Sequence, residues 1–430
     1  MIGQVADAST RRAIRGMLTL ATGAGAGKLI GIASLPIITR LYSPADIGAL
    51  AVFASFLMLA APLLTLQYRQ ALPVPRTDGA AINLLCLCAS LIFGMSSFLA
   101  AALALAADPL FRALSMDAVA SWWWMLPLGT AVYALFTTCQ LWATRRRRYG
   151  AIARAEVTQS AAGNGAKIAL AFALPPPLGL LVGHVVAQGG GIVQLGAVTV
   201  PDIARLWRHV TLRRVRTVAR QYQGFPLFRL PSQLVLILSS QAPVFFIAAF
   251  FGAATAGQFG LAMMALSMPM NLIGRTMAKA FFGEMAHLGR RAGPEIRQSV
   301  LLLTRLLGAV GLVVALLLYF AAPPLFPLLF GPQWAEAGAF AAILAILVTF
   351  QFVAAPIMNV LSVFRREDVY LQLNLQRLCL VAAVFGCAYL FELPIDVTLL
   401  AYSMLLAMHY ILCFFRVLSV MPRQTATGSA

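Results

Sequence analysis

The sequence divides into about twelve apolar stretches, each long enough to cross the ~30 Å hydrocarbon core of a bilayer as a helix. Hydrophobic residues make up 61% of the 430 residues, and charged residues only 11%. Because every backbone group in lipid needs an internal partner, helices are the form that such stretches adopt. The sequence therefore predicts an all-α, polytopic integral membrane protein. Its segments are expected, with errors of several residues at each end, near residues 17–38, 46–66, 80–105, 119–141, 152–173, 177–200, 226–250, 256–280, 300–321, 337–360, 371–391 and 396–419.

The basic residues distinguish the two sides of the membrane, because most of them lie in every second gap between apolar segments. About 25 of the 32 Lys and Arg residues lie in or beside gaps on one side, whereas Arg40 and Arg112 lie on the other. Positive residues favour the cytosolic side, so both termini are predicted to be cytosolic. The formal net charge of +18 also suits a nucleic-acid-binding protein, but this placement fits membrane topology and anionic lipid instead. We therefore expect membrane lipid as a partner and no nucleic acid.

The longest cytosolic gap divides the chain into two sets of six segments. We predict an N-terminal six-helix lobe over residues 1–200, a linker over 201–225 and a C-terminal six-helix lobe over 226–430. Apolar residues of the linker fall on one side of a helical wheel and arginines on the other, which predicts a basic amphipathic helix on the membrane surface. A weak match between Leu41–Gly48 and Phe250–Gly257 supports two lobes related by an axis along the membrane normal.

The sequence offers little support for a metal site, a disulfide or a nucleotide site. All six cysteines fall inside apolar segments, and the four histidines lack the spacing of metal ligands. Residues 23–28 resemble a phosphate-binding loop, but Thr22 stands where a glycine is needed and Leu29 where Ser or Thr is needed. We expect neither a metal nor a cofactor.

Lysine and arginine residues inside the apolar segments are the candidates for function, since a charge at mid-membrane costs several kcal/mol unless it faces water or a partner. Lys28 lies beside Gly23, Gly27 and Gly31, whose spacing predicts close contact with another helix. Two interpretations are open for Lys28: it lines a lumen, or it snorkels or pairs with a neighbouring helix.

The same choice applies to a larger set of polar residues. Packing against a polar helix is the alternative for the fifth segment, and snorkelling is the alternative for the arginines and lysine nearest the cytosol. Glu156 is the one acid expected inside the membrane, so a lumen built from these residues is net positive and attracts an anion such as a phosphate-bearing amphiphile. The predicted substrate-binding cations are Lys28, Lys167, Arg229, Arg275 and Lys279, and the predicted polar lining is Glu156, Gln159, Ser160, Asn164, Ser232, Gln233 and Asn271.

Most of the chain resembles the Wzx-type polysaccharide and O-antigen repeat-unit flippases of the multidrug/oligosaccharidyl-lipid/polysaccharide exporter superfamily. The resemblance rests on Lys28 followed by residues 36–44 and Gly48, on residues 142–145, on Phe225-Pro226 with Pro231-Ser232, and on a later set of residues: Pro243, Phe251, Gly252, Gly257, Pro269 and Gly274. Tyr68 matches the tyrosine of a family Tyr-Glu pair, but Arg69 replaces the acid.

The resemblance implies a flippase of the bacterial cytoplasmic (inner) membrane, with two lobes around a cationic cavity, that serves surface polysaccharide biosynthesis, whether of lipopolysaccharide or of an exopolysaccharide. Its expected cargo is an undecaprenyl-diphosphate-linked oligosaccharide moved from the inner to the outer leaflet by alternating access. H⁺ or Na⁺ is the expected coupling ion, and polysaccharide assembly proteins are expected partners. The alternatives are another exporter of the superfamily, for lipid II or for drugs, and a membrane polymerase or ligase acting on lipid-linked sugars. We favour a transporter over an enzyme, because no outer loop exceeds about 16 residues in this map.

Overall fold

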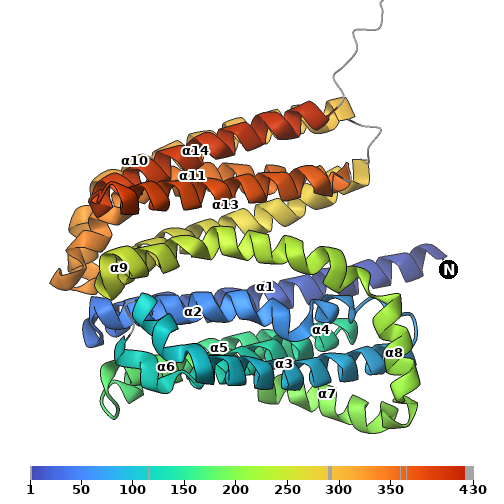
Figure 1. Ribbon diagram of the computed structural model, residues 1–430. Helices are drawn as coiled ribbons and strands as arrows, with labels where there is room; N and C mark the ends of the chain where they lie inside the picture. The colour runs from blue at the N-terminus through green and yellow to red at the C-terminus, as the bar shows by residue number, and fades with distance from the viewer. Residues whose placement is uncertain (1, 115–116, 289–292, 359, 365, 422–430) are drawn as a thin grey trace, which may run out of the picture. The chain divides into compact units, whose positions relative to one another are not determined.

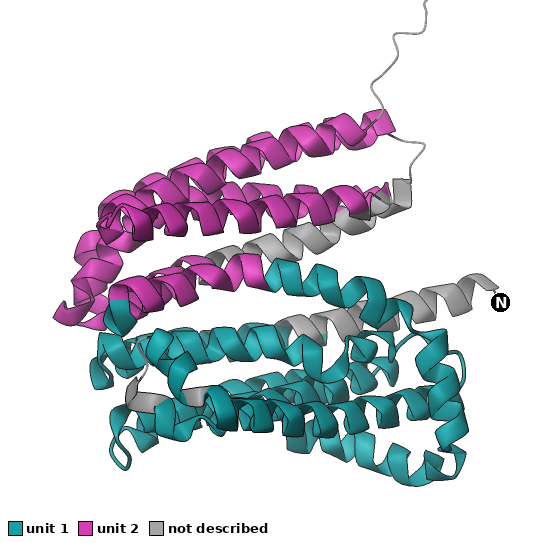
Figure 2. Cartoon of the chain, viewed as in Figure 1, with its two compact units in different colours: residues 1–237, 252–254 teal, residues 238–251, 255–430 magenta. Residues whose placement is uncertain are grey.

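The computed structural model describes residues 2–114, 117–288, 293–358, 360–364 and 366–421. Within these ranges the regular structure is helical, which confirms the predicted all-α fold (Figure 1). Contacts group the chain into two compact units (Figure 2): unit 1 is Met1–Ile237 with Gly252–Ala254, and unit 2 is Leu238–Phe251 with Thr255–Ala430. Residues 201–225 therefore belong to unit 1 by their contacts, while the lobe boundaries predicted from the sequence stay predictions.

The helices of unit 1 follow the first six predicted segments closely. The first two are joined by a short turn, in which Ser43 caps α2 by accepting from the Asp46 amide at 3.3 Å and Asp46 accepts in return from the Ser43 amide at 2.9 Å. This capping box satisfies amide groups that the first helical turn leaves without partners. The helices are α1 (Ile2–Leu41), α2 (Pro44–Thr65), α3 (Asp78–Ala113), α4 (Met125–Arg145), α5 (Tyr149–Leu170), α6 (Pro176–Gly189), α7 (Ile192–Leu206) and α8 (Leu212–Gln221).

The later helices begin with α9, which crosses from one unit to the other. Gly252 breaks α9 with φ 87° and ψ 167°, a conformation that glycine tolerates and other residues avoid. The predicted segments 226–250 and 256–280 thus lie on either side of one glycine turn. The helices are α9 (Leu230–Leu288), α10 (Gly293–Phe330), α11 (Ala335–Met358), α12 (Val360–Val363), α13 (Glu367–Leu390) and α14 (Ile395–Val420).

Nine helical stretches in the described ranges are long and apolar enough to cross a membrane. The sequence predicted twelve segments, and the difference has three sources. The α4 and α5 helices have suitable lengths but are too polar to meet this hydropathy criterion, and the two segments around Gly252 count as one stretch. The predicted segments nevertheless fall on helices, although the sixth, 177–200, is divided between α6 and α7 at Gly190 and Gly191.

The short helix α8 packs against other helices of unit 1 through its apolar side. Val218 is 5% exposed and lies in a cluster with Ile82, Leu85 and Trp142, while Tyr68 donates its hydroxyl to the carbonyl of Ala219 at 3.0 Å. Figure 1 shows α8 running across one end of this helical layer, where it contacts α3. Its arginines are exposed, whereas its apolar side is buried against other helices of unit 1, as expected for an amphipathic helix. Contact of the arginine side with anionic lipid stays a prediction.

Candidate functional site

The glycine stripe of α1 forms the close helix contact that its spacing predicts. A Cβ atom on Gly23 would lie 2.5 Å from that of Ala153 on α5, and one on Gly27 would lie 3.1 Å from the carbonyl oxygen of Glu156. Ser160 donates to the Gly27 carbonyl at 2.6 Å. Helices α1 and α5 therefore touch backbone to backbone at these glycines.

Lys28 follows the glycine that contacts α5, but its own side chain lies elsewhere. Gly27 is buried against α5, whereas Lys28 is exposed on α1. It lies 13 residues before the end of this helix, far from either terminus. A lysine in the middle of a long apolar helix stays a candidate for a functional role, because a charge at that depth is costly.

Lys167 has a different environment, because it lies in the last turn of α5 and packs on α6. A Cβ atom on Gly183 would lie 2.5 Å from the Lys167 Cγ, so the glycine makes room for the lysine side chain. Tyr42 donates its hydroxyl to the Lys167 carbonyl at 2.6 Å, which places this turn beside the end of α1. His184 is close enough to Lys167 for an electrostatic interaction, and its Nε2 lies 2.9 Å from the Nε2 of Gln188.

The predicted polar stripe of α5 is used largely in helix packing. Glu156 accepts from Gln140 of α4 at 3.1 Å. Asn164 donates to the Ser160 carbonyl at 3.0 Å, and the Gln159 Cα lies 3.0 Å from where a Cβ on Gly190, the residue after α6, would be. These contacts fit the alternative in which the polar side of α5 packs against other helices. A substrate role for these residues stays a prediction.

The predicted residues at the start of α9 lie in and beside the one-turn π-helix Phe225–Arg229. Arg229 is exposed, with its guanidinium carbon 6.0 Å from the centre of the Phe225 ring. Ser232 donates to the Phe228 carbonyl at 3.0 Å, and Gln233 is partly buried. The side chains of Asn271, Arg275 and Lys279 lie outside the described residues, so their predicted roles stay predictions.

Two arginines, the buried Arg69 and the partly buried Arg377, were not predicted as site residues. Arg69, 8% exposed, donates to the Thr137 hydroxyl of α4, so it links α4 to the short 3-10 helix Tyr68–Ala71 that follows α2. Arg377 lies in the middle of α13 and packs over the ring of Tyr410 on α14. Its place inside the predicted apolar segment 371–391 is a signal of function, although Arg377 is one of the 25 basic residues assigned above to membrane topology.

Ion pairs join α3, α4 and α7 at the end of unit 1 near α8. Arg146 contacts Asp78 at 2.9 Å and Asp202 at 2.7 Å, and Trp142 also donates to Asp202 at 3.0 Å. Burial alone lowers the pKa of Arg146, but the hydrogen bonds to Asp78 and Asp202 outweigh it and raise that pKa. Arg145 contacts Asp78 as well, at 3.1 Å. These pairs are structural, since each charge has a partner.

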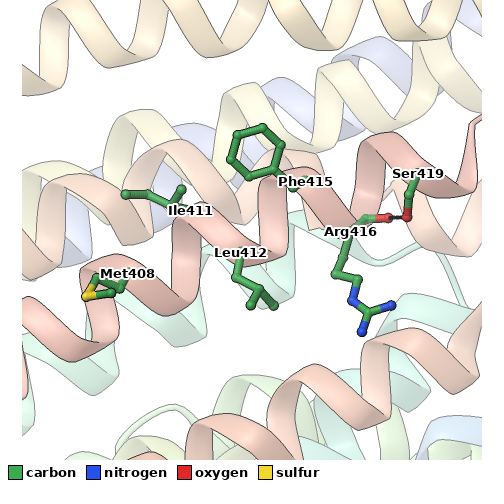
Figure 3. Close-up of a pocket in the computed structure, with 6 residues that line it drawn as sticks. All are labelled: Met408, Ile411, Leu412, Phe415, Arg416 and Ser419. Atoms are coloured by element: carbon green, nitrogen blue, oxygen red, sulfur yellow. Dashed lines mark hydrogen bonds between the residues drawn. The ribbon is translucent and has the colours of Figure 1, made fainter.

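A hollow beside α14 is a poorer candidate for substrate binding. Its six lining residues come from that one helix (Figure 3), and Ser419 donates to the backbone carbonyl of Arg416 at 2.8 Å. Specific ligand sites usually combine polar groups from several elements. The hollow is lined by Met408, Ile411, Leu412, Phe415, Arg416 and Ser419.

A family model described as "Polysaccharide biosynthesis protein" matches residues 37–339, which is more than half of the chain. The chain belongs to this family. No curated protein sequence matches it. The family match is consistent with the resemblance to polysaccharide flippases found in the sequence.

Solved structures with a similar fold are transporters of one superfamily. An inward-facing multidrug resistance MATE family transporter of the MOP superfamily has a TM-score of 0.62 at 14% identity, over 95% of this chain and 96% of the other. The lipid II flippase MurJ in an inward closed conformation has a TM-score of 0.63 at 11% identity, over 94% and 90%. A MOP superfamily transporter from Pyrococcus furiosus, described as having a binding pocket of reverse polarity, has a TM-score of 0.61 at 13% identity, over 95% and 96%. At these identities the likeness establishes the fold: a multi-pass, two-lobe transporter fold.

Proposed function

We propose that this protein is a flippase that moves a polyprenyl-diphosphate-linked oligosaccharide from the inner to the outer leaflet of a bacterial cytoplasmic membrane. Membership of the polysaccharide biosynthesis family and the fold of membrane exporters support a transport role in making polysaccharide. The fold is shared with drug exporters and a lipid II flippase, so it does not choose the cargo. The cargo has to be inferred from charge.

The sign of the charges inside the helices is the observation that favours an anionic cargo. Lys28 and Arg377 lie more than two turns from the ends of their helices. Among the described side chains, Glu156 is the acid that lies well inside a helix, and it already accepts from Gln140. The remaining described acids lie near helix ends or in turns. A cationic drug requires acidic residues in its binding site, whereas a diphosphate is bound by lysine and arginine.

Lys28 is the residue that we assign to the diphosphate. Lys28 is exposed on α1 while the neighbouring Gly27 packs against α5, so helix packing fixes the position of the lysine along the helix. A charge-assisted hydrogen bond to phosphate contributes about 1.5–3 kcal/mol. Its loss should weaken cargo binding by roughly ten- to a hundredfold.

The test is translocation of a polyprenyl-diphosphate-linked oligosaccharide in vesicles containing the purified protein. Lys28→Ala should lower the initial rate at least tenfold at a subsaturating cargo concentration, and Lys28→Arg should retain most of it because the charge remains. The matched control is Arg40→Ala, which removes an exposed cation from the end of the same helix. Full activity of Lys28→Ala at equal protein level contradicts the assigned role, and absence of translocation by the unaltered protein contradicts the proposed function.

A further inference from the structure

The short helix α8 is held in place at both of its ends. Asn83 of α3 is fully buried; it donates to the His209 carbonyl at 3.0 Å and accepts from the Thr211 amide at 3.3 Å, which fixes the residues just before the helix. The Thr211 side chain also caps the first turn of α8. Near the other end, Tyr68 donates to the Ala219 carbonyl at 3.0 Å. The side chains of α8 therefore extend from a backbone with a defined position on unit 1.

One side of α8 carries exposed arginines and no acid. These arginines recur at helical spacing on the side opposite the buried Val218. The arginine row consists of Arg213, Arg216 and Arg220. Residues 203–225 contain no Asp or Glu, and Asp202 just before them is already paired with Arg146 at 2.7 Å. The arginine row is therefore a positive surface that no acid of its own segment neutralises.

The level of α8 along α3 is that of lipid headgroups. Val218 packs in one cluster with Ile82 and Leu85, which lie one and two turns after α3 begins at Asp78. The apolar stretch Asp78–Ala106 has 29 residues, whereas about 20 cross the hydrocarbon core. This excess length, together with the charge at Asp78, places the first turns of α3 in the headgroup region. Because α8 crosses α3 there (Figure 1), the arginine row faces away from α3 at headgroup depth.

Two large apolar side chains are exposed beside the arginine row. Trp207, 61% exposed, lies in the one-turn 3-10 helix that precedes α8, and Leu212, 68% exposed, is the first residue of α8. Leu212 lies one turn before Arg216, so these two side chains are neighbours on the helix. Tryptophan favours the membrane–water interface, because its ring is apolar and its N–H is polar. Exposed cations and apolar groups at this depth match a lipid surface better than bulk water.

We propose that the arginine row, with Trp207 and Leu212 beside it, binds anionic phospholipid headgroups of the surrounding bilayer. Arginines near a membrane surface attract anionic lipid, and guanidinium groups bind phosphate through paired hydrogen bonds. Protein already covers the apolar side of α8, so binding depends on charge more than it does for a helix that inserts an apolar face into lipid. The surface includes no residue assigned to the cargo, and the proposal stands or falls independently of the transport function.

The experiment places a fluorescent reporter in this surface and measures which lipid touches it. Leu212→Trp adds an indole one turn before Arg216, and the protein is reconstituted in vesicles of phosphatidylcholine and phosphatidylglycerol in equal amounts. Bromine, which quenches tryptophan on contact, is carried by the phosphatidylglycerol in one preparation and by the phosphatidylcholine in the other. Subtracting the signal of the protein with Leu212 isolates the new tryptophan. Brominated phosphatidylglycerol should quench it about threefold more strongly than brominated phosphatidylcholine.

Neutral variants show whether the arginine row causes this preference. Replacing the row by glutamine should make the two lipids quench equally; the changes are Arg213→Gln, Arg216→Gln and Arg220→Gln. These arginines form no ion pair among the described residues, so the triple variant should fold. Arg112→Gln removes an exposed arginine at the opposite end of α3 and should leave the preference unchanged. Salt at about 1 M should abolish the preference without any change in the row, because it shortens the Debye length to about 3 Å.

The outcomes that overturn the proposal are distinct. Equal quenching by the two lipids with the arginine row intact shows that charge does not select the lipid. Absence of quenching by either lipid places α8 in water. A preference that persists in the triple variant removes the role of the arginines. Displacement of brominated phosphatidylglycerol by a small fraction of polyprenyl diphosphate assigns the surface to the cargo headgroup instead of to phospholipid.

Discussion

Single glycine residues decide how closely the helices of unit 1 approach one another. Gly163 and Gly165 lie two residues apart on α5 but face different surroundings. A Cβ atom on Gly163 would lie 2.3 Å from the Cβ of Ala187 on α6, while one on Gly165 would meet nothing within 4 Å. The first glycine is required for packing, and the second is not.

These two positions give a matched pair of alanine substitutions. Gly163→Ala should reduce stability by about 1–3 kcal/mol, because α5 and α6 have to move apart to admit a methyl group. Gly165→Ala should be neutral or stabilise by about 0.5–1 kcal/mol, since alanine favours the helix. Thermal unfolding of the two variants in the same detergent measures the difference. Equal stabilities contradict the close packing of α5 on α6.

At the residue scale, the sequence predicted close helix contacts at glycines better than it predicted the environments of individual charged side chains. The spacing of Gly23 and Gly27 predicts close helix contact because small residues act through local geometry alone. The environment of Lys167 depends on Gly183, which belongs to another helix and cannot be matched to it from one sequence. Arg377 shows the same limit: its partners on α14 become visible only when α13 and α14 are paired.

At the scale of helices, hydrophobic length predicted the elements well because it reflects the bilayer thickness. It did not explain how α4 and α5, whose hydropathy falls below that of the other spans, are accommodated as helices of suitable length. Nor did it distinguish two helices from one helix with a break, as at Gly252. A polar helix face is tolerated in a membrane protein when neighbouring helices bury it. Which helices are neighbours is determined by the fold and not by the segment itself.

The end of α7, just before α8, is held by an ion pair between Asp202 and Arg146. Asp202→Asn should remove the charge-assisted contact with Arg146 and weaken the one with Trp142, at a cost of about 1–2 kcal/mol because both charged groups are partly exposed. Trypsin should then cut at the exposed arginines of α8 about tenfold faster. Asp108→Asn, at the opposite end of α3, is the control. Unchanged cleavage after Asp202→Asn contradicts the view that these pairs hold the segment in place.

At the scale of the whole molecule, the fold is that of a two-lobe transporter, and we propose that charge rather than architecture selects the cargo. Drug exporters and a lipid II flippase share this fold at 11–14% identity, so architecture leaves the substrate open. The sequence predicted the fold class because twelve long apolar segments permit few alternatives. The net positive charge that the sequence predicts inside the membrane stays a prediction.

The most direct measurement compares two cargoes that differ only in charge. Vesicles containing the protein receive the same oligosaccharide linked to a polyprenyl chain either through a diphosphate or through a neutral ether. If cationic residues such as Lys28 recognise the cargo, the diphosphate-linked form should be translocated at least tenfold faster, and Lys28→Ala should narrow that ratio. Equal rates for the two cargoes, or faster transport of the neutral one, contradict the account.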